Sequence, residues 1–139
     1  MPDTTDFGPA LAAACLYAGL NALIAVWLSV RVVRLRRSRS LSLGDGGQPD
    51  AQRAIRAHGN FVEYAPLGLV LVTLTALTGA PPLAVHLLGL CLTAGRLCHA
   101  WHFVSANPTL TTRAAGMILT YAALALGGLG LVGHALTEL

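Results

Sequence analysis

The sequence predicts an all-α integral membrane protein whose chain folds into a bundle of four transmembrane helices. Two observations lead to this prediction. Apolar residues make up 55% of the 139 positions and charged residues only 11%, whereas a soluble domain carries about 25% charged residues. The charged residues also gather in a few segments and leave long uncharged stretches between them, which is the pattern of membrane spans.

Each helix is predicted from an apolar stretch and from the polar residues that bound it. Residues 8–30 contain no charged side chain, and about 20 apolar residues cross a hydrocarbon core about 30 Å thick. Five arginines and a Gly-rich connection follow. Residues 79–82 (Gly-Ala-Pro-Pro) predict a helix-breaking turn, and Asn107-Pro108 predicts the last loop. We therefore expect one domain over residues 1–139, with helices at about 8–39, 52–78, 83–104 and 113–135.

The basic residues, all of them arginines, predict the orientation in the membrane. Eight of the nine lie at the end of the first helix, at the start of the second or at the start of the fourth. The opposite side carries Asp3, Asp6 and Glu138 and no arginine. By the positive-inside rule, the Arg-rich loops are cytoplasmic and both termini lie outside. The N-terminal segment is acidic where a signal peptide would be positive, so we expect the first helix to be retained.

Several classes of site are disfavoured by the sequence. The three cysteines lie in apolar stretches without a CxxC pair, so we interpret them as packing residues. The five histidines lack a metal-binding spacing, and we expect no metal site. The basic segments lack the interleaved aromatic residues that stack on bases, so we expect no nucleic-acid partner.

Two charged residues, Glu63 and Arg96, lie well inside the apolar segments. On insertion scales each costs roughly 2.5 to 3.5 kcal/mol at a helix centre, so each needs a partner or a water-filled cavity. Glu63 precedes Gly79 by about 24 Å of helix, and Arg96 follows Pro82 by about 21 Å. We therefore expect both at one depth of an antiparallel hairpin, in the cytoplasmic third of the bilayer.

The side chains near this depth are expected to form one face of each helix. They are Arg53, Arg56, Asn60 and Glu63 on the second helix, and Arg96, His99 and Phe103 on the third. One explanation is an ion pair between Glu63 and Arg96 that only fixes helix packing. The other is a polar pocket to which Arg113 also contributes. An intramembrane cluster of ionisable residues is by default a functional-site hypothesis, which favours the pocket.

The same residues carry a family resemblance. Residues 56–66 (Arg-Ala-His-Gly-Asn-Phe-Val-Glu-Tyr-Ala-Pro) and residues 95–99 (Gly-Arg-Leu-Cys-His) resemble the MAPEG family, the membrane proteins of eicosanoid and glutathione metabolism. Residues 44–47 (Gly-Asp-Gly-Gly) resemble the bacterial branch, and Asp45 stands where some members have a functional aspartate. The resemblance covers roughly residues 34–121. It implies a homotrimer in a bacterial inner membrane, with glutathione bound between neighbouring subunits.

The resemblance also implies that glutathione is the co-substrate and that six residues bind it. They are Arg34, Arg56, Asn60, Glu63, Arg96 and His99. Arg34 is similar to a basic residue that contacts the glycyl end, and Arg113 resembles the arginine that holds the thiolate in catalytic members. Arg113 is therefore the candidate catalytic residue. The sequence departs from mammalian members at Gly59 and Phe103, which removes one cation and one hydroxyl. We expect Tyr121 to be a core residue.

The chemistry of these side chains suits glutathione. Guanidinium groups bind carboxylates in bidentate fashion, and Glu63 can pair with the ammonium group. A cysteine-like thiol, with a pKa of about 8.5, is mostly protonated at pH 7 unless a nearby cation lowers that pKa. We therefore expect a transferase or peroxidase-type enzyme in which an Arg-stabilised thiolate attacks lipophilic electrophiles held in the membrane lipid.

Two alternatives remain open. The first is a non-catalytic MAPEG-like scaffold that binds glutathione or a lipid. The second is a small four-helix multidrug transporter, although such transporters usually carry their essential carboxylate in the first helix, where residues 8–30 have no charge. The sequence does not identify the electrophile, because apolar walls that face lipid carry little specificity.

Overall fold

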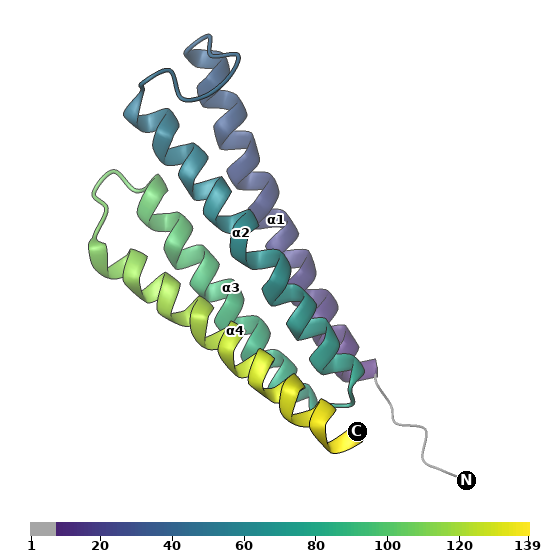
Figure 1. Ribbon diagram of the computed structural model, residues 1–139. Helices are drawn as coiled ribbons and strands as arrows, with labels where there is room; N and C mark the ends of the chain where they lie inside the picture. The colour runs from purple at the N-terminus through teal and green to yellow at the C-terminus, as the bar shows by residue number, and fades with distance from the viewer. Residues whose placement is uncertain (1–7) are drawn as a thin grey trace.

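The computed structural model describes residues 8–139, and these residues form four helices joined by short connections (Figure 1). The helices are α1 (Gly8–Ser38), α2 (Pro49–Leu77), α3 (Pro82–Val104) and α4 (Leu110–Glu138). They run alternately in opposite directions, so the α1–α2 and α3–α4 connections share one end of the molecule. The α2–α3 turn lies at the other end, with the start of α1 and the end of α4. The predicted four-helix fold is confirmed. Asp3 and Asp6 lie outside the described residues.

Two helices extend beyond the bounds expected from the sequence. α2 begins at Pro49 instead of near residue 52. Proline suits the first turn of a helix, where its missing N–H has no partner in any case. α4 runs from Leu110 to Glu138, so Arg113 lies one turn inside the helix instead of at its start. The expected bounds followed the charged residues, which mark the membrane boundary, whereas the helical backbone continues past that boundary.

Gly79 forms the turn between α2 and α3. Its φ angle is +79°, a conformation that favours glycine after a helix. The backbone N–H groups of Gly79 and Ala80 donate to the carbonyls of Ala76 and Thr75, which lie in the last turn of α2. α3 then begins at Pro82, again with proline in the first turn. The turn therefore reverses the chain within a few residues, as the antiparallel α2–α3 hairpin requires.

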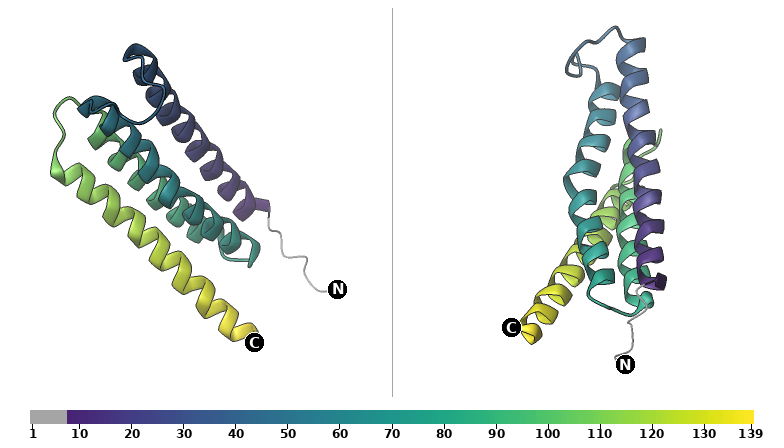
Figure 2. Two further views of the ribbon diagram at one scale, coloured as in Figure 1. Left: turned by 45° about the horizontal axis from the view of Figure 1, so that its top comes forward. Right: turned by 90° about the vertical axis from the view of Figure 1, so that its right-hand side faces the viewer.

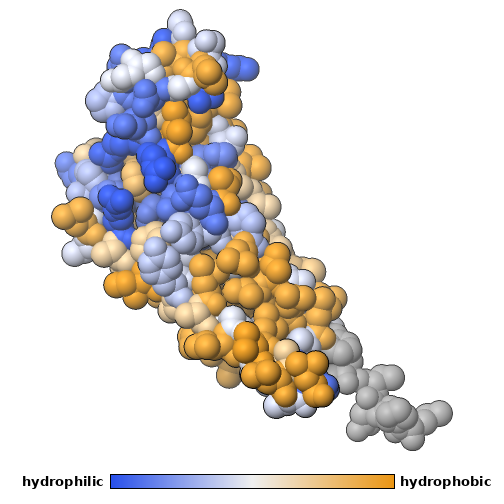
Figure 3. Space-filling view, viewed as in Figure 1, coloured by the Kyte–Doolittle hydropathy of each residue, from blue (hydrophilic) through white to orange (hydrophobic). Residues whose placement is uncertain are grey.

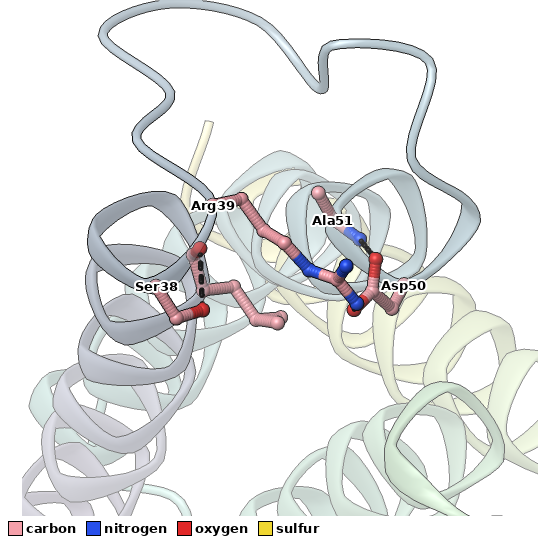
Figure 4. A network of polar contacts seen from close by, with 5 residues as sticks. Ser38, Arg39, Asp50 and Ala51 are labelled. Atoms are coloured by element: carbon pink, nitrogen blue, oxygen red, sulfur yellow. Dashed lines mark hydrogen bonds and ion pairs between the residues drawn. The ribbon is translucent and has the colours of Figure 1, made fainter.

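A polar network joins the end of α1 to the start of α2 (Figure 4). Arg39 Nη2 lies 2.8 Å from Asp50 Oδ2, and Asp50 Oδ1 accepts a hydrogen bond from the backbone N–H of Ala51. The Ser38 hydroxyl donates to the carbonyl of Leu35 at 3.0 Å. Because the side chains of Arg39 and Asp50 are both exposed, their ion pair contributes little to stability. It nevertheless ties the two helix ends together.

α4 packs on α2 and α3 but not on α1. Within residues 8–139, α1 and α4 are the one pair of helices without a contact, and Figure 2 shows the C-terminal part of α4 standing away from the other helices. The buried residues of α4 follow one another at helical spacing. They are Gly116, Thr120, Ala123 and Gly127. This face lets the α3 and α4 backbones touch, since a Cβ on Gly116 would lie 2.6 Å from His99 N and 2.8 Å from Gly95 O.

The polar surface lies at the end of the bundle that holds the α1–α2 and α3–α4 connections. Figure 3 shows hydrophilic atoms gathered at this end and a mostly hydrophobic surface at the other. All four helices are long and apolar enough to cross a bilayer. The grouping of charges expected from the sequence is therefore present, whereas the side of the membrane that this end faces stays a prediction.

The contact between α3 and α4 yields a stability prediction. Gly116→Ala should lower the stability of the protein by about 1–3 kcal/mol, because the added methyl group forces the two backbones apart. Gly128→Ala is the matched control on the same helix, since a Cβ there meets no atom within 4 Å. Thermal unfolding of both variants in detergent would test this, and equal unfolding temperatures for the two would contradict it.

Candidate functional site

Arg96 of α3 lies between α2 and α4 and is only 1% exposed. Its Nη1 donates to the side-chain oxygen of Asn60 at 2.8 Å and to the Asn60 carbonyl at 3.3 Å. Its Nε and Nη2 donate to the Thr120 hydroxyl at 3.0 and 2.6 Å. That hydroxyl in turn donates to the carbonyl of Gly116 at 2.8 Å. Arg96 therefore connects all three helices through hydrogen bonds.

No carboxylate neutralises Arg96 within the described part of the chain. The salt bridge that these residues form joins Arg39 to Asp50, and Glu63 lies on the exposed side of α2. The ion pair between Glu63 and Arg96, one of the two explanations left open by the sequence, is therefore not formed within one chain. Removing an ion from water costs several kcal/mol, and an anion close to Arg96 would offset part of that cost.

Tyr64 and Tyr121 lie next to Arg96 on the surface of the chain. The guanidinium carbon of Arg96 is 5.3 Å from the centroid of the Tyr64 ring, within the range of a cation–π interaction. The Tyr64 and Tyr121 hydroxyls are 3.4 Å apart, and their rings meet edge to face. Tyr121 is 52% exposed, so the expectation that it is a core residue is wrong for the single chain. Two phenol groups thus border the buried cation.

Arg56 and Glu63 lie on the outward face of α2. Exposed residues recur along this helix at helical spacing, from the Arg-rich end to the other end. They are Gln52, Arg56, Glu63, Pro66, Val70, Leu74 and Leu77. The stripe is polar up to Glu63 and apolar from Pro66 onward. Ionisable side chains on the outward face of a membrane helix need a partner from outside the chain, either a ligand or another protein surface.

Arg113 is exposed on α4, and its guanidinium carbon lies 5.7 Å from the centroid of the Phe103 ring. The Phe103 ring also lies close to the rings of His99 and His102, whose centroids are 5.2 and 5.1 Å away. His99 is 4% exposed and lies where Gly116 brings the α4 backbone against α3. The candidate catalytic residue is therefore in contact with the helix that carries Arg96 and His99. It has no direct hydrogen bond to either of them.

Arg34 lies apart from the other candidates. It lines a cavity of about 530 Å³ between α1, the start of α2 and the end of α3. The other six candidates do not line this cavity. Within one chain the candidates therefore divide into a buried group (Asn60, Arg96 and His99), an exposed group (Arg56, Glu63 and Arg113), and Arg34.

Arg53 proves to be a structural residue. Its Nη2 donates to the carbonyls of His102 at 2.9 Å and Ser105 at 3.2 Å, and its Nε donates to the carbonyl of Phe103 at 3.3 Å. The last carbonyls of a helix have no partner within the helix, and a cation there also interacts favourably with the helix dipole. Arg53 of α2 therefore caps the C-terminus of α3.

Thr120 is the site residue that the sequence did not indicate. Threonine is common in apolar helices because its hydroxyl can bond to the carbonyl four residues earlier, so residue type alone does not mark it. The distance of Thr120 from the α3–α4 connection could have indicated that it lies near Arg96. Counted from the α3–α4 connection, Arg96 lies about 12 Å along α3 and Thr120 about 15 Å along α4. An antiparallel pair of helices brings such positions to the same level.

A comparison with known families covers all of these candidate residues. The model of the MAPEG family matches residues 14–133, which include most of all four helices and every candidate residue. The chain belongs to the MAPEG family. It is also 43% identical over 111 residues to the inner membrane protein YecN of Escherichia coli (strain K12), covering 80% of this chain and 83% of that protein. YecN of Escherichia coli O6:H1 matches with the same identity and coverage.

Membership of the MAPEG family confirms the resemblance seen in the motif and argues against the transporter alternative. The four apolar helices are those of a MAPEG membrane bundle, so the chain is an integral membrane protein. In this MAPEG protein, Asp45 lies in the α1–α2 connection, where its Oδ1 accepts the backbone N–H of Gly47 at 2.9 Å. A carboxylate bonded to the backbone two residues on stabilises a turn.

The hydrogen bonds of Thr120 yield a second stability prediction. Thr120→Val should destabilise this MAPEG protein by about 1–3 kcal/mol, because buried N–H groups of Arg96 lose their acceptor. Thr75→Val is the matched control, since the Thr75 hydroxyl makes only the local bond to the Leu71 carbonyl. Thr120→Ser should retain most of the stability. Thermal unfolding would measure all three variants, and equal effects of the two valine substitutions would contradict the prediction.

Proposed function

We propose that this MAPEG protein binds glutathione within the membrane and conjugates it to lipophilic electrophiles. The main support is the buried and unneutralised Arg96, which lies beside a surface that exposes Arg56 and Glu63. This arrangement offers fixed positive charge, one free guanidinium and one free carboxylate at membrane depth. Within residues 8–139 none of these charges has an ion-pair partner, so a charged ligand would satisfy them together.

Glutathione has the matching set of charges. Its two carboxylates suit guanidinium groups, which bind carboxylates in bidentate fashion. Its ammonium group suits Glu63, whose carboxylate is unpaired within the described residues. We assign direct contact to the exposed Arg56 and Glu63. The side-chain oxygen of Asn60 accepts a hydrogen bond from Arg96 and so holds that arginine in place. His99 lies on α3, where the α4 backbone packs against it. This assignment makes the contacts of Asn60 and His99 with the ligand indirect.

The site is completed by a second copy of the chain in this proposal. Arg34 lines a separate cavity and lies on α1, which does not contact α4. The outward face of α2 also continues beyond Glu63 as an apolar stripe suited to helix packing. A homotrimer, as the family resemblance implies, would bring Arg34 of one subunit to the ligand held by Arg56 and Glu63 of the next.

The proposed reaction uses the thiolate of glutathione. Arg113 is exposed one turn inside α4, so its guanidinium is free to approach a sulfur atom. A cation there lowers the pKa of the thiol, and a shift of about two units corresponds to about 2.7 kcal/mol. The thiolate then attacks the electrophilic carbon and forms a C–S bond, while the leaving group departs with its electron pair. The surrounding lipid supplies the apolar substrate.

The alternative function is glutathione or lipid binding without catalysis. One observation favours it, because the Phe103 ring that contacts Arg113 offers no hydroxyl to the thiol. The test is to add glutathione to the purified protein and look for the ultraviolet band of the thiolate. Tight binding without this band and without turnover would establish the non-catalytic function.

We also propose a location and an orientation. YecN is named as an inner membrane protein, and we assign this chain to the same kind of membrane. With the Arg-rich end cytoplasmic, the buried Arg96 and the exposed Glu63 would lie in the cytoplasmic third of the bilayer. A glutathione site there would open toward the cytoplasm and toward the lipid.

A substitution at Glu63 tests the binding proposal. Glu63→Gln should weaken glutathione binding about tenfold, since a neutral amide does not balance the ammonium group of the ligand. Its effect on thermal stability should be small, because Glu63 is exposed and has no ion-pair partner among residues 8–139. Isothermal titration of the detergent-solubilised protein would measure the affinity, with Glu138→Gln as the control. Unchanged affinity together with a large loss of stability would show that Glu63 is structural.

A substitution at Arg113 tests the reaction. Arg113→Ala should lower turnover at pH 7 about 20-fold while glutathione affinity changes little, because most of the thiol returns to its protonated form. The thiolate band should fade at neutral pH and return at higher pH. Arg113→Lys should recover part of the turnover, since a point charge does not reproduce the guanidinium fork. Wild-type turnover and thiolate band in Arg113→Ala would assign to Arg113 only an anchoring role at the membrane surface.

A further inference from the structure

The cavity between α1, α2 and the end of α3 has an unusual balance of charges. Its volume of about 530 Å³ falls within the range of about 300–1,000 Å³ typical of ligand pockets. Three guanidinium groups line it, those of Arg31, Arg34 and Arg53. The one carboxylate in its wall belongs to Asp50, which already pairs with Arg39 at 2.8 Å. The cavity is therefore strongly positive.

The hydrogen-bonding capacity of these arginines is not used up. Arg31 Nε is buried and has no hydrogen-bond partner within the described residues. Arg53 spends its Nε and one terminal nitrogen on the α3 carbonyls, which leaves its Nη1 available. A buried N–H of a charged group that lacks an acceptor is costly. An anion with several acceptor oxygens would satisfy both arginines at once.

The cavity also lies at the level of lipid headgroups. Arg31 is the first charged residue after the uncharged stretch 8–30, and that stretch spans about 35 Å of helix, slightly more than a hydrocarbon core. Arg31 therefore lies where the hydrocarbon ends and lipid phosphates begin. Leu35, Phe103 and Val104 supply apolar walls beside the three arginines. Basic pockets between membrane helices at this level suit anionic headgroups.

We infer that this cavity binds the phosphate of an anionic phospholipid, with Arg31 and Arg53 as its donors. The cavity lies apart from Arg56, Glu63 and Arg113, which do not line it, and Arg34 is the one glutathione candidate in its wall. Glutathione fits it poorly, since no free carboxylate is present to balance the ammonium group. A zwitterionic headgroup such as phosphocholine leaves its cation unmatched for the same reason. The site therefore selects a lipid with a net negative charge.

The experiment uses the purified, delipidated protein in detergent and native mass spectrometry. Phosphatidylglycerol should be retained at least about tenfold more tightly than phosphatidylcholine. Arg31→Gln should reduce retention of phosphatidylglycerol about tenfold. Arg37→Gln is the matched control, because Arg37 is an exposed arginine of the same helix that does not line the cavity. It should retain the lipid as the parent protein does.

Several results would overturn the inference. Equal losses in Arg31→Gln and Arg37→Gln would show only diffuse attraction to the basic end, and equal retention of both lipids by the parent protein would remove the proposed selectivity. Displacement of phosphatidylglycerol by inorganic phosphate or glutathione would assign the cavity to a soluble anion. If Arg31→Gln altered the oligomeric state but left lipid retention unchanged, the cavity would be assigned to contact with a neighbouring copy of the chain. If Arg31→Gln does not fold, Arg31→Lys takes its place. Arg31→Lys should lose phosphatidylglycerol retention severalfold, and unchanged retention would contradict the inference.

Discussion

The burial of Arg96 is the interaction on which the rest of the structure depends. A guanidinium group inside a membrane protein must find its acceptors on neighbouring helices, and here α2 provides Asn60 and α4 provides Thr120. The Thr120 hydroxyl comes within reach because Gly95 and Gly116 let the α3 and α4 backbones touch. The hydrogen bonds satisfy the N–H groups of Arg96 but do not neutralise its positive charge, because no carboxylate among residues 8–139 pairs with it.

The sequence was sufficient to predict the four helices and their connections. It also predicted that polar residues of α2 and α3 lie at similar levels of the hairpin, because the helix rise and the position of the turn determine that level. It was not sufficient to predict which way each side chain points. Glu63 and Asn60 lie three residues apart, yet Asn60 contacts Arg96 whereas Glu63 is exposed. The rotation of α2 about its axis decides this difference, and it is determined by the packing of small residues such as Ala57 and Ala65 in the core. Thr120 was missed for a related reason, because its role comes from the hydrogen bonds that it accepts from Arg96.

The division of the candidates into buried and exposed groups separates two kinds of contribution. Asn60 and Thr120 hold a charge in place, so we expect changes at these positions to act on stability first. Arg56, Glu63 and Arg113 are accessible, and in the proposed function they contact the ligand. Arg34 lies in a third location, on a helix without contact to α4. In the proposed function one chain therefore holds only parts of the glutathione site, and subunit assembly is a precondition for binding.

The Arg53 cap on α3 affects how the length of the α3–α4 loop can change in evolution. Arg53 fixes the end of α3 from α2, and His102 Nδ1 donates to the carbonyl of Thr109 just before α4. Both ends of the short segment between these residues are thus anchored by contacts that do not involve Asn107 or Pro108. Insertions or deletions between the anchors would change the length of the loop without moving Arg96 or Thr120. The α3–α4 loop is therefore a place where the lineage can gain or lose residues while the buried cation keeps its acceptors.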